Sequence, residues 1–168
     1  MDEALLQRLE AYIKENYVPI RGYYQISAEP PKKDGKKEAP AAPCDYFQLE
    51  LNLPPLEKSF AAALLELIRA KGKTEIEIYK KARIDRRLFS KIRTNTDYTP
   101  SKATILALII ALELTTDEAN DLLKRAGYCL SRSKKEDVVV QFFIEKQIYD
   151  LFSVQKALEH FGLPVLGG

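Results

Sequence analysis

The stretch KGKTEIEIYKKARIDRRLFSKIR, residues 71–93, combines cationic side chains with two helix-start signals only eleven residues apart. Across residues 69–102, eleven basic side chains stand against four acidic ones, a net charge of +7 in a chain whose total is +2. A local excess of this size creates a positive potential that attracts anions. These residues are therefore suited to binding an anionic partner.

Two short helices are expected to present these cations. Thr74 and Glu77 have the spacing of a capping box, which predicts a helix from Glu75 to about Ala82. Only about three residues separate this helix from the start signal of the next one. A connection that short forces the two helices to cross steeply, which is the geometry of a helix-turn-helix.

The second helix is expected to begin at Arg86, with Asp85 as its N-cap. Ile84 and Phe89 bracket this cap in the pattern of a hydrophobic staple, and Ile92 shares the inward side with Phe89. The polar side chains of this helix must then face mostly outward: Arg86, Arg87, Ser90, Lys91 and Arg93.

Nucleic acid is the anionic partner that this arrangement favours. The exposed N-terminal part of such a second helix enters the major groove, where arginine bridges guanine O6 and N7. Lysine and serine reach phosphates or base edges. The candidates for reading bases are Arg86, Arg87, Ser90 and Lys91, and the candidates for contacting phosphates are Lys71, Lys73, Lys80, Arg93 and Lys102.

The other elements are also expected to be mainly helical, because apolar residues recur at helical spacing. Ser101 is the expected N-cap of a helix that is apolar nearly all round, and this helix should be buried at the centre. A capping box at Thr115 and Glu118 opens the next helix, which should close at Gly127. The remaining expected helices cover 2–16, 56–72, 133–147 and 152–161.

The N-terminal third of the chain differs in composition. Residues 28–43 are rich in Pro, Lys, Ala and Glu, which predicts a mobile loop or linker. Residues 20–26 and 46–53 flank this loop and can pair as a short β-ribbon, since the second alternates apolar residues with a period of two. Three parts are expected along the chain: an N-terminal extension over 1–55, a helix-turn-helix domain over 56–130, and a C-terminal helical extension over 131–168.

Several classes of protein are disfavoured by the composition of these 168 residues. No apolar run approaches the roughly 20 residues of a membrane span, and the N-terminus lacks the layout of a secretory signal, so a cytoplasmic protein is expected. Cys44 and Cys129 are widely separated and are expected to be free thiols. The only histidine is His160, and no metal cluster, cofactor motif or catalytic constellation is recognisable. We therefore expect no enzyme, cofactor or metal.

Residues 60–127 resemble a lambda-repressor-like (Cro/repressor, XRE-type) helix-turn-helix domain of five helices. The resemblance is carried by LLELIRAKGKTEIEIYKKARIDRRLFSKIR and by PSKATILALIIALELTTDEANDLL. A variant widespread in bacteria is similar through the C-terminal FGLPVLG as well. The resemblance implies a mainly α, repressor-like fold and DNA binding, with Arg86, Arg87, Ser90 and Lys91 at positions where the family contacts DNA.

Four residues depart from the pattern of that family. Tyr79 stands where a small residue lets the two helices cross closely, and Arg83 stands where the turn usually has Gly. Leu88 replaces a small base-reading residue, so that an outward Leu can contact a thymine methyl or a protein partner. Glu75 replaces the usual Gln that binds a phosphate, and a carboxylate there repels one.

Two functions follow from these observations. The first is a sequence-specific DNA-binding transcriptional regulator that inserts helix 86–94 into the major groove, with a homodimer through the C-terminal pair 133–161 as the means of reading a longer site. That pair can instead pack on its own domain. The second is a protein-interaction or adaptor module that keeps the fold without binding DNA, for example as a regulator of a partner enzyme or within a defence system.

Overall fold

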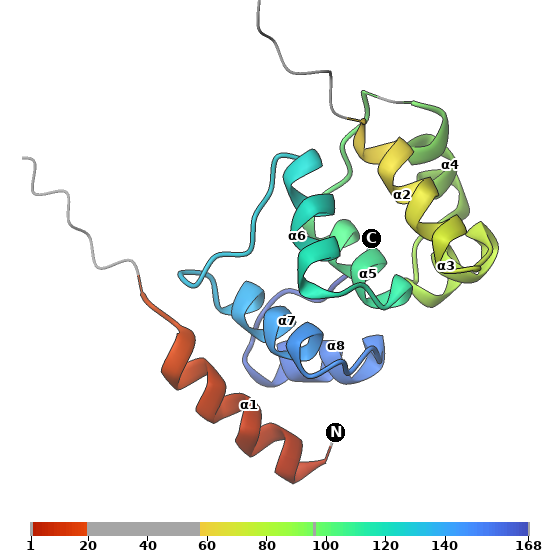
Figure 1. Ribbon diagram of the computed structural model, residues 1–168. Coiled ribbons are helices and arrows are strands. Elements are labelled where there is room, and N and C mark those ends of the chain that lie inside the picture. The colour runs from red at the N-terminus through yellow and green to blue at the C-terminus, as the bar shows by residue number, and fades with distance from the viewer. Residues whose placement is uncertain (1, 20–57, 96, 168) are drawn as a thin grey trace, which may run out of the picture. The chain divides into compact units, whose positions relative to one another are not determined.

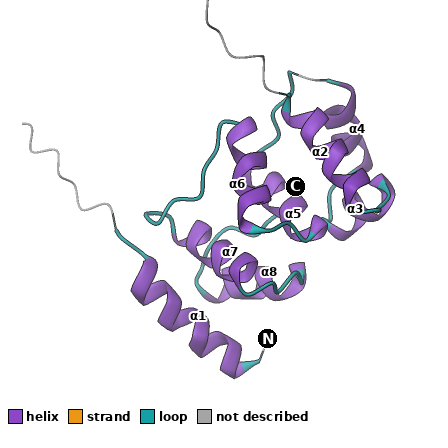
Figure 2. Ribbon diagram, viewed as in Figure 1, coloured by secondary structure: helices purple, strands orange, loops and turns teal. Residues whose placement is uncertain are grey.

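The computed structural model describes residues 2–19, 58–95 and 97–167. Within these residues the chain forms eight helices and no strand, so the mainly α class is confirmed (Figures 1 and 2). The expected ribbon of 20–26 and 46–53 and the loop 28–43 lie outside them. Met1–Pro19 and Lys58–Gly168 form one compact unit. The helices are α1 (Glu3–Asn16), α2 (Phe60–Ala70), α3 (Glu75–Lys81), α4 (Arg86–Thr94), α5 (Lys102–Leu112), α6 (Thr116–Arg125), α7 (Lys135–Glu145) and α8 (Leu151–His160).

Six of the eight described helices begin at a residue whose side chain caps the first turn. Thr74 and Thr115 each form a complete capping box with the Glu three residues later, as the sequence predicts. Ser101 accepts a hydrogen bond from the Thr104 N–H and starts α5 at the expected position. These side chains satisfy backbone N–H groups that the first helical turn leaves without a partner.

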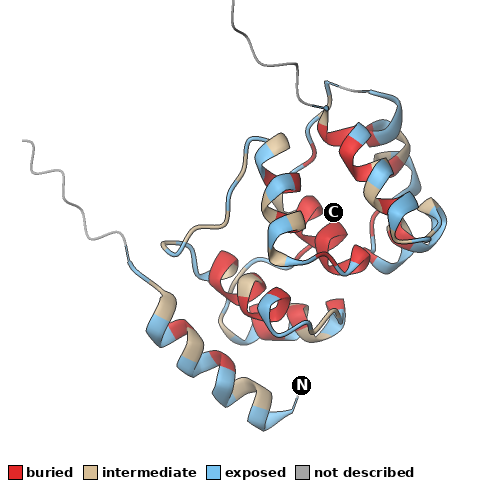
Figure 3. Ribbon diagram, in the orientation of Figure 1, coloured by how far each residue is buried: buried red, intermediate tan, exposed pale blue. Residues whose placement is uncertain are grey.

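The core is organised around α5, as its uniform apolar pattern predicts. All nine residues from Thr104 to Leu112 are buried, and α5 contacts α3, α6 and α8 (Figure 3). α2 contacts α3, α4 and α6, so that it joins α4 to the rest of the unit. The two short helices that carry the cationic segment, α3 and α4, therefore pack against buried helices of the same unit.

The C-terminal helices α7 and α8 complete this core, and α1 packs against α7. Leu9 and Ile13 of α1 are buried, and the Tyr12 ring meets Phe142 of α7 edge-on at 5.2 Å between centroids. The Tyr12 hydroxyl donates a hydrogen bond of 2.8 Å to Glu145 Oε2. Burial, followed by this hydrogen bond, raises the pKa of the hydroxyl, which therefore stays protonated as a donor.

Burial also bears on the predicted homodimer. The apolar side chains that would form such an interface, Val138, Val139, Phe142 and Phe143, are all buried within the same chain. A homodimer remains a prediction, but it has to use other surfaces than these side chains. None of the helices that the structure describes is both long and apolar enough to cross a lipid bilayer.

Candidate nucleic-acid interface

α4 is oriented by apolar side chains, as the staple pattern predicts. Ile84, Phe89 and Ile92 are all buried in the common core. Asp85 caps the helix by accepting a hydrogen bond of 2.6 Å from the Arg87 N–H. With one side of α4 held against the core, its polar residues are left on the remaining surface.

The four residues expected to read bases lie on that surface. Arg86, Arg87 and Lys91 are exposed and Ser90 is half-buried. Among the described residues, no ion pair or side-chain hydrogen bond engages the guanidinium group of Arg86 or Arg87. The ammonium of Lys91 lies 4.0 Å from the centroid of the Tyr98 ring, a cation–π contact that leaves the charge accessible.

Most of the residues expected to contact phosphates are already paired with carboxylates. The pairs are Lys71 with Glu118 at 2.9 Å, Lys73 with Glu113 at 2.9 Å, Arg93 with Glu75 at 3.1 Å, and Lys102 with Asp137 at 2.5 Å. Of the five, only Lys80 is exposed with no such contact in the part of the chain that the structure describes. Three of the four acids come from outside residues 69–102, so they lower the local excess of positive charge from seven to four.

Glu113 is the residue at this surface that sequence reasoning missed. It lies just past the last turn of α5 and accepts hydrogen bonds from both Lys81 (2.6 Å) and Lys73 (2.9 Å). The bond from Lys81, then that from Lys73, lowers the pKa of the carboxyl to about 2. An acid ending an otherwise apolar helix is visible in the sequence, but its partners lie 32 and 40 residues away.

Lys102 holds the start of α5 to α7. The Asp137 carboxylate is fully buried, accepts from the Lys102 ammonium and accepts a hydrogen bond of 2.9 Å from the Ser131 N–H. Lys102 also donates to the Cys129 carbonyl at 2.7 Å. Because removing one partner of a buried ion pair leaves the other charge uncompensated, we assign Lys102 a structural role. Cys129 itself is a free, exposed thiol.

The four departures from the family pattern have definite structural outcomes. Arg83 adopts the left-handed conformation expected for the turn, with φ of +54°. The Tyr79 ring covers Phe89, with 5.8 Å between centroids. Leu88 is half-buried: it packs against the core and keeps part of its side chain exposed. Glu75 is neutralised by Arg93, which weakens the repulsion of phosphate that a free carboxylate would exert.

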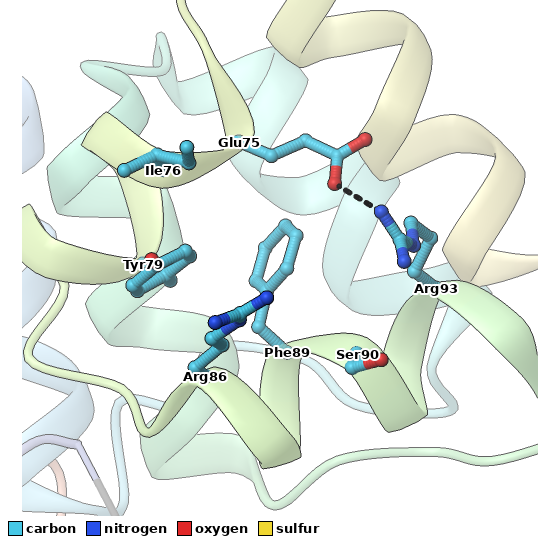
Figure 4. Close-up of a pocket in the computed structure, with 7 residues that line it drawn as sticks. All are labelled: Glu75, Ile76, Tyr79, Arg86, Phe89, Ser90 and Arg93. Carbon is cyan, nitrogen blue, oxygen red and sulfur yellow. Dashed lines mark hydrogen bonds and ion pairs between the residues drawn. The ribbon is translucent and has the colours of Figure 1, made fainter.

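A groove of about 340 Å³ runs between α3 and α4 (Figure 4). α3 contributes Glu75, Ile76 and Tyr79, and α4 contributes Arg86, Phe89, Ser90 and Arg93. The Phe89 ring lies between the unpaired guanidinium of Arg86 and the Glu75–Arg93 ion pair, whereas the Tyr79 ring lies on the far side of the groove from that pair (Figure 4). The surface that presents the base-reading candidates thus contains a hollow with a partly apolar lining.

No protein family, curated protein or solved structure matches this chain. The resemblance to lambda-repressor-like domains therefore stays a prediction. The geometry and charge of α3 and α4 are the features of the chain that point to a function.

Proposed function

We propose that this chain binds duplex DNA in a sequence-specific manner, as a transcriptional regulator that places α4 in the major groove. The observation that carries the proposal is the state of Arg86 and Arg87. Both side chains are exposed on the first turn of α4, and within the described residues neither has an acidic partner. Arginines presented in this way are available for bidentate contacts to guanine.

The rigid support of α4 also favours this function. Phe89 and Ile92 are 3% and 1% exposed, so the backbone that carries the two arginines is held by the core. A side chain on a fixed helix loses less conformational entropy on binding than one on a mobile loop. Lys80 and Lys91 add exposed positive charge on the same two helices.

The test is a binding titration with the double variant Arg86→Ala/Arg87→Ala. A fluorescently labelled pool of random-sequence duplexes first yields the preferred site by repeated selection, and anisotropy then measures affinity for it. We expect the double variant to bind at least tenfold more weakly, because each arginine–guanine contact contributes about 1–3 kcal/mol of discrimination. Its circular dichroism and unfolding midpoint should match those of the parent protein.

The matched control removes two positive charges elsewhere. Lys14 on α1 and Lys146 after α7 are exposed, and Lys14→Ala/Lys146→Ala changes the net charge by the same amount. This control should retain nearly full affinity. Equal weakening by the two double variants would mean that only net charge matters, and full binding by Arg86→Ala/Arg87→Ala would refute the assignment.

The second candidate function is a protein-interaction module, and one observation favours it. Glu75, Glu113 and Glu118 neutralise cations that a DNA-binding surface would offer to phosphates. Retention on heparin at low salt separates the two functions. Elution without retention, in a preparation free of nucleic acid, would favour the interaction module.

A further inference from the structure

We propose that the groove between α3 and α4 is a docking site for an acidic segment of a partner protein that carries a bulky apolar side chain. The groove is hollow, partly apolar and bordered by unpaired positive charge. These three properties define the occupant.

The apolar part of the groove calls for an apolar anchor. Ile76 is 56% exposed, and it lines the hollow together with the rings of Tyr79 and Phe89. A single exposed Ile needs no explanation by itself, but here it borders a hollow in which those two rings also lie. An apolar side chain inserted there removes the exposed surface of Ile76 and Tyr79 from water, and Phe89, which is already buried, forms the floor beneath it.

The charge of the groove calls for a carboxylate beside that anchor. The guanidinium of Arg86 lines the groove, and no carboxylate engages it in the described part of the chain. Arg87, Lys91 and Lys80 lie exposed on the same two helices. A carboxylate next to the apolar anchor can form a bidentate pair with Arg86, and further acids in the segment match the surrounding potential.

The groove is long enough for a short peptide segment. Arg86 and Arg93 mark its ends and are seven residues apart on α4, which is about 10 Å at 1.5 Å per residue. That distance suits two or three residues of an extended segment or two turns of a helix. A nucleic acid fits the hollow less well, because the exposed Ile76 side chain offers nothing to a phosphodiester backbone.

Docking in the groove has a consequence that depends on the proposed function. Arg86 belongs both to the groove and to the surface proposed to read DNA. A partner segment paired with Arg86 and a DNA duplex cannot then occupy α4 together. The partner would act as an antagonist of DNA binding.

The experiment selects a phage-displayed library of random dodecapeptides against the full-length protein. We expect enriched sequences to combine a Leu, Ile, Phe or Tyr with neighbouring Asp or Glu. A synthetic peptide of the enriched sequence should bind the parent protein. It should bind the variants Ile76→Lys and Arg86→Gln at least tenfold more weakly than the parent. Its version with Asn and Gln in place of the acids should also bind at least tenfold more weakly.

Val18→Lys provides the matched control, because Val18 has the same exposed fraction as Ile76, 56%, and lies outside the groove. This variant should bind the peptide as the parent does. Failure to enrich any sequence, equal binding to Ile76→Lys, or a consensus without acids would overturn the proposal. So would a labelled single-stranded oligonucleotide that binds in a manner dependent on Ile76, since the occupant would then be nucleic acid.

The same preparations distinguish this inference from the proposed function. Ile76→Lys adds a positive charge beside the surface that reads DNA, so DNA affinity should be kept while peptide binding is lost. Ile76-dependent peptide binding without any duplex binding would support the groove and refute DNA recognition. Duplex binding without a groove-dependent peptide would do the reverse.

Discussion

Three residues other than glycine hold left-handed backbone conformations in the described part of the chain: Arg83, Glu113 and Gln147. Each follows the last turn of a helix. After α7, the Gln147 N–H donates to the Ile144 carbonyl and the Ile148 N–H to the Phe143 carbonyl, the pattern of a Schellman motif. Glycine is preferred at this position because a Cβ atom raises the energy of the left-handed conformation.

Replacing Gln147 with Gly should stabilise the protein. The side chain is exposed and φ is +55°, so removing the Cβ relieves strain without removing packing. We expect the free energy of unfolding to rise by about 0.5–1 kcal/mol in urea titrations. Lys146→Gly is the control, because the neighbouring φ of −86° is ordinary and glycine there should stabilise nothing. A loss of stability in Gln147→Gly would contradict the left-handed assignment.

The ion pair between Glu75 and Arg93 leads to a second prediction at the scale of single residues. Glu75→Gln should release Arg93 to contact a phosphate and remove a negative charge from the proposed DNA surface. The slope of log affinity against log salt should then steepen by about 0.9, the value for one additional phosphate contact. The measurement is anisotropy with the selected duplex at several salt concentrations.

Glu66→Gln controls for the change in net charge in that experiment. Glu66 on α2 pairs at 2.6 Å with Lys58, which precedes that helix, so its substitution also removes one acid from a pair with a basic side chain. Its salt slope should match that of the parent. If Glu75→Gln leaves the slope unchanged, Arg93 does not reach the DNA.

At the scale of elements, the end of α5 is joined to α3 and to the loop before it through charge. Glu113 accepts hydrogen bonds from Lys81 at the end of α3 and from Lys73 just before α3. The position of α3 relative to the core therefore depends on an ionised carboxylate as well as on Ile78, which is fully buried.

Stability should accordingly depend on the ionisation of Glu113. Its pKa is about 2 in the folded protein against an ordinary value of 4.5. Because the folded value is the lower one, the contribution is complete above pH 4.5 and disappears as the pH falls through about 2. The side chain is 44% exposed, so screening by solvent limits this contribution to about 1 kcal/mol or less.

The variant Glu113→Gln tests this dependence in urea titrations at pH 7, 4 and 3. It should be less stable than the parent at pH 7, and the difference should shrink as the pH falls. Glu159→Gln is the control: Glu159 is exposed, and no ion pair engages it among the described residues. A difference between Glu113→Gln and the parent that stays constant with pH would show that its cause is not the charge.

At the scale of the whole molecule, α1 and the C-terminal helices share one core. α1 contacts α7, and the Val18 N–H donates to the Arg132 carbonyl at 2.9 Å. Helices at opposite ends of the sequence thus stabilise each other, and the compact unit should unfold as one.

Leu9→Ala should therefore destabilise the unit as a whole. Leu9 is fully buried, and the loss of a buried Leu side chain costs about 2–5 kcal/mol. Tyrosine fluorescence and far-ultraviolet circular dichroism should report the same shifted midpoint in urea. Leu5→Ala, at a half-buried position of the same helix, should cost less. Separate transitions for the two probes would show that α1 folds independently.

Much of the local structure was predictable because its causes lie within a few residues. Helix starts are defined by contacts between residues two or three positions apart. These are the capping boxes at Thr74 and Thr115 and the N-caps Asp85 and Ser101. The apolar pattern of α5 predicted its burial, because a helix that is apolar on every side has no face suited to water. The partial burial of Leu88 was not predicted, because the core covers more of α4 than the Phe89–Ile92 pair alone indicates.

The sequence by itself determined the positions of the helices, the burial of α5 and the outward direction of Arg86 and Arg87. Only the tertiary structure decided which cations stay free. The acids that pair with three of the lysines are distant in the sequence: Glu113 lies 40 residues from Lys73, Glu118 lies 47 from Lys71, and Asp137 lies 35 from Lys102. Helix starts depend on neighbouring residues, whereas charge pairing depends on distance through space, which exists only once the chain has folded.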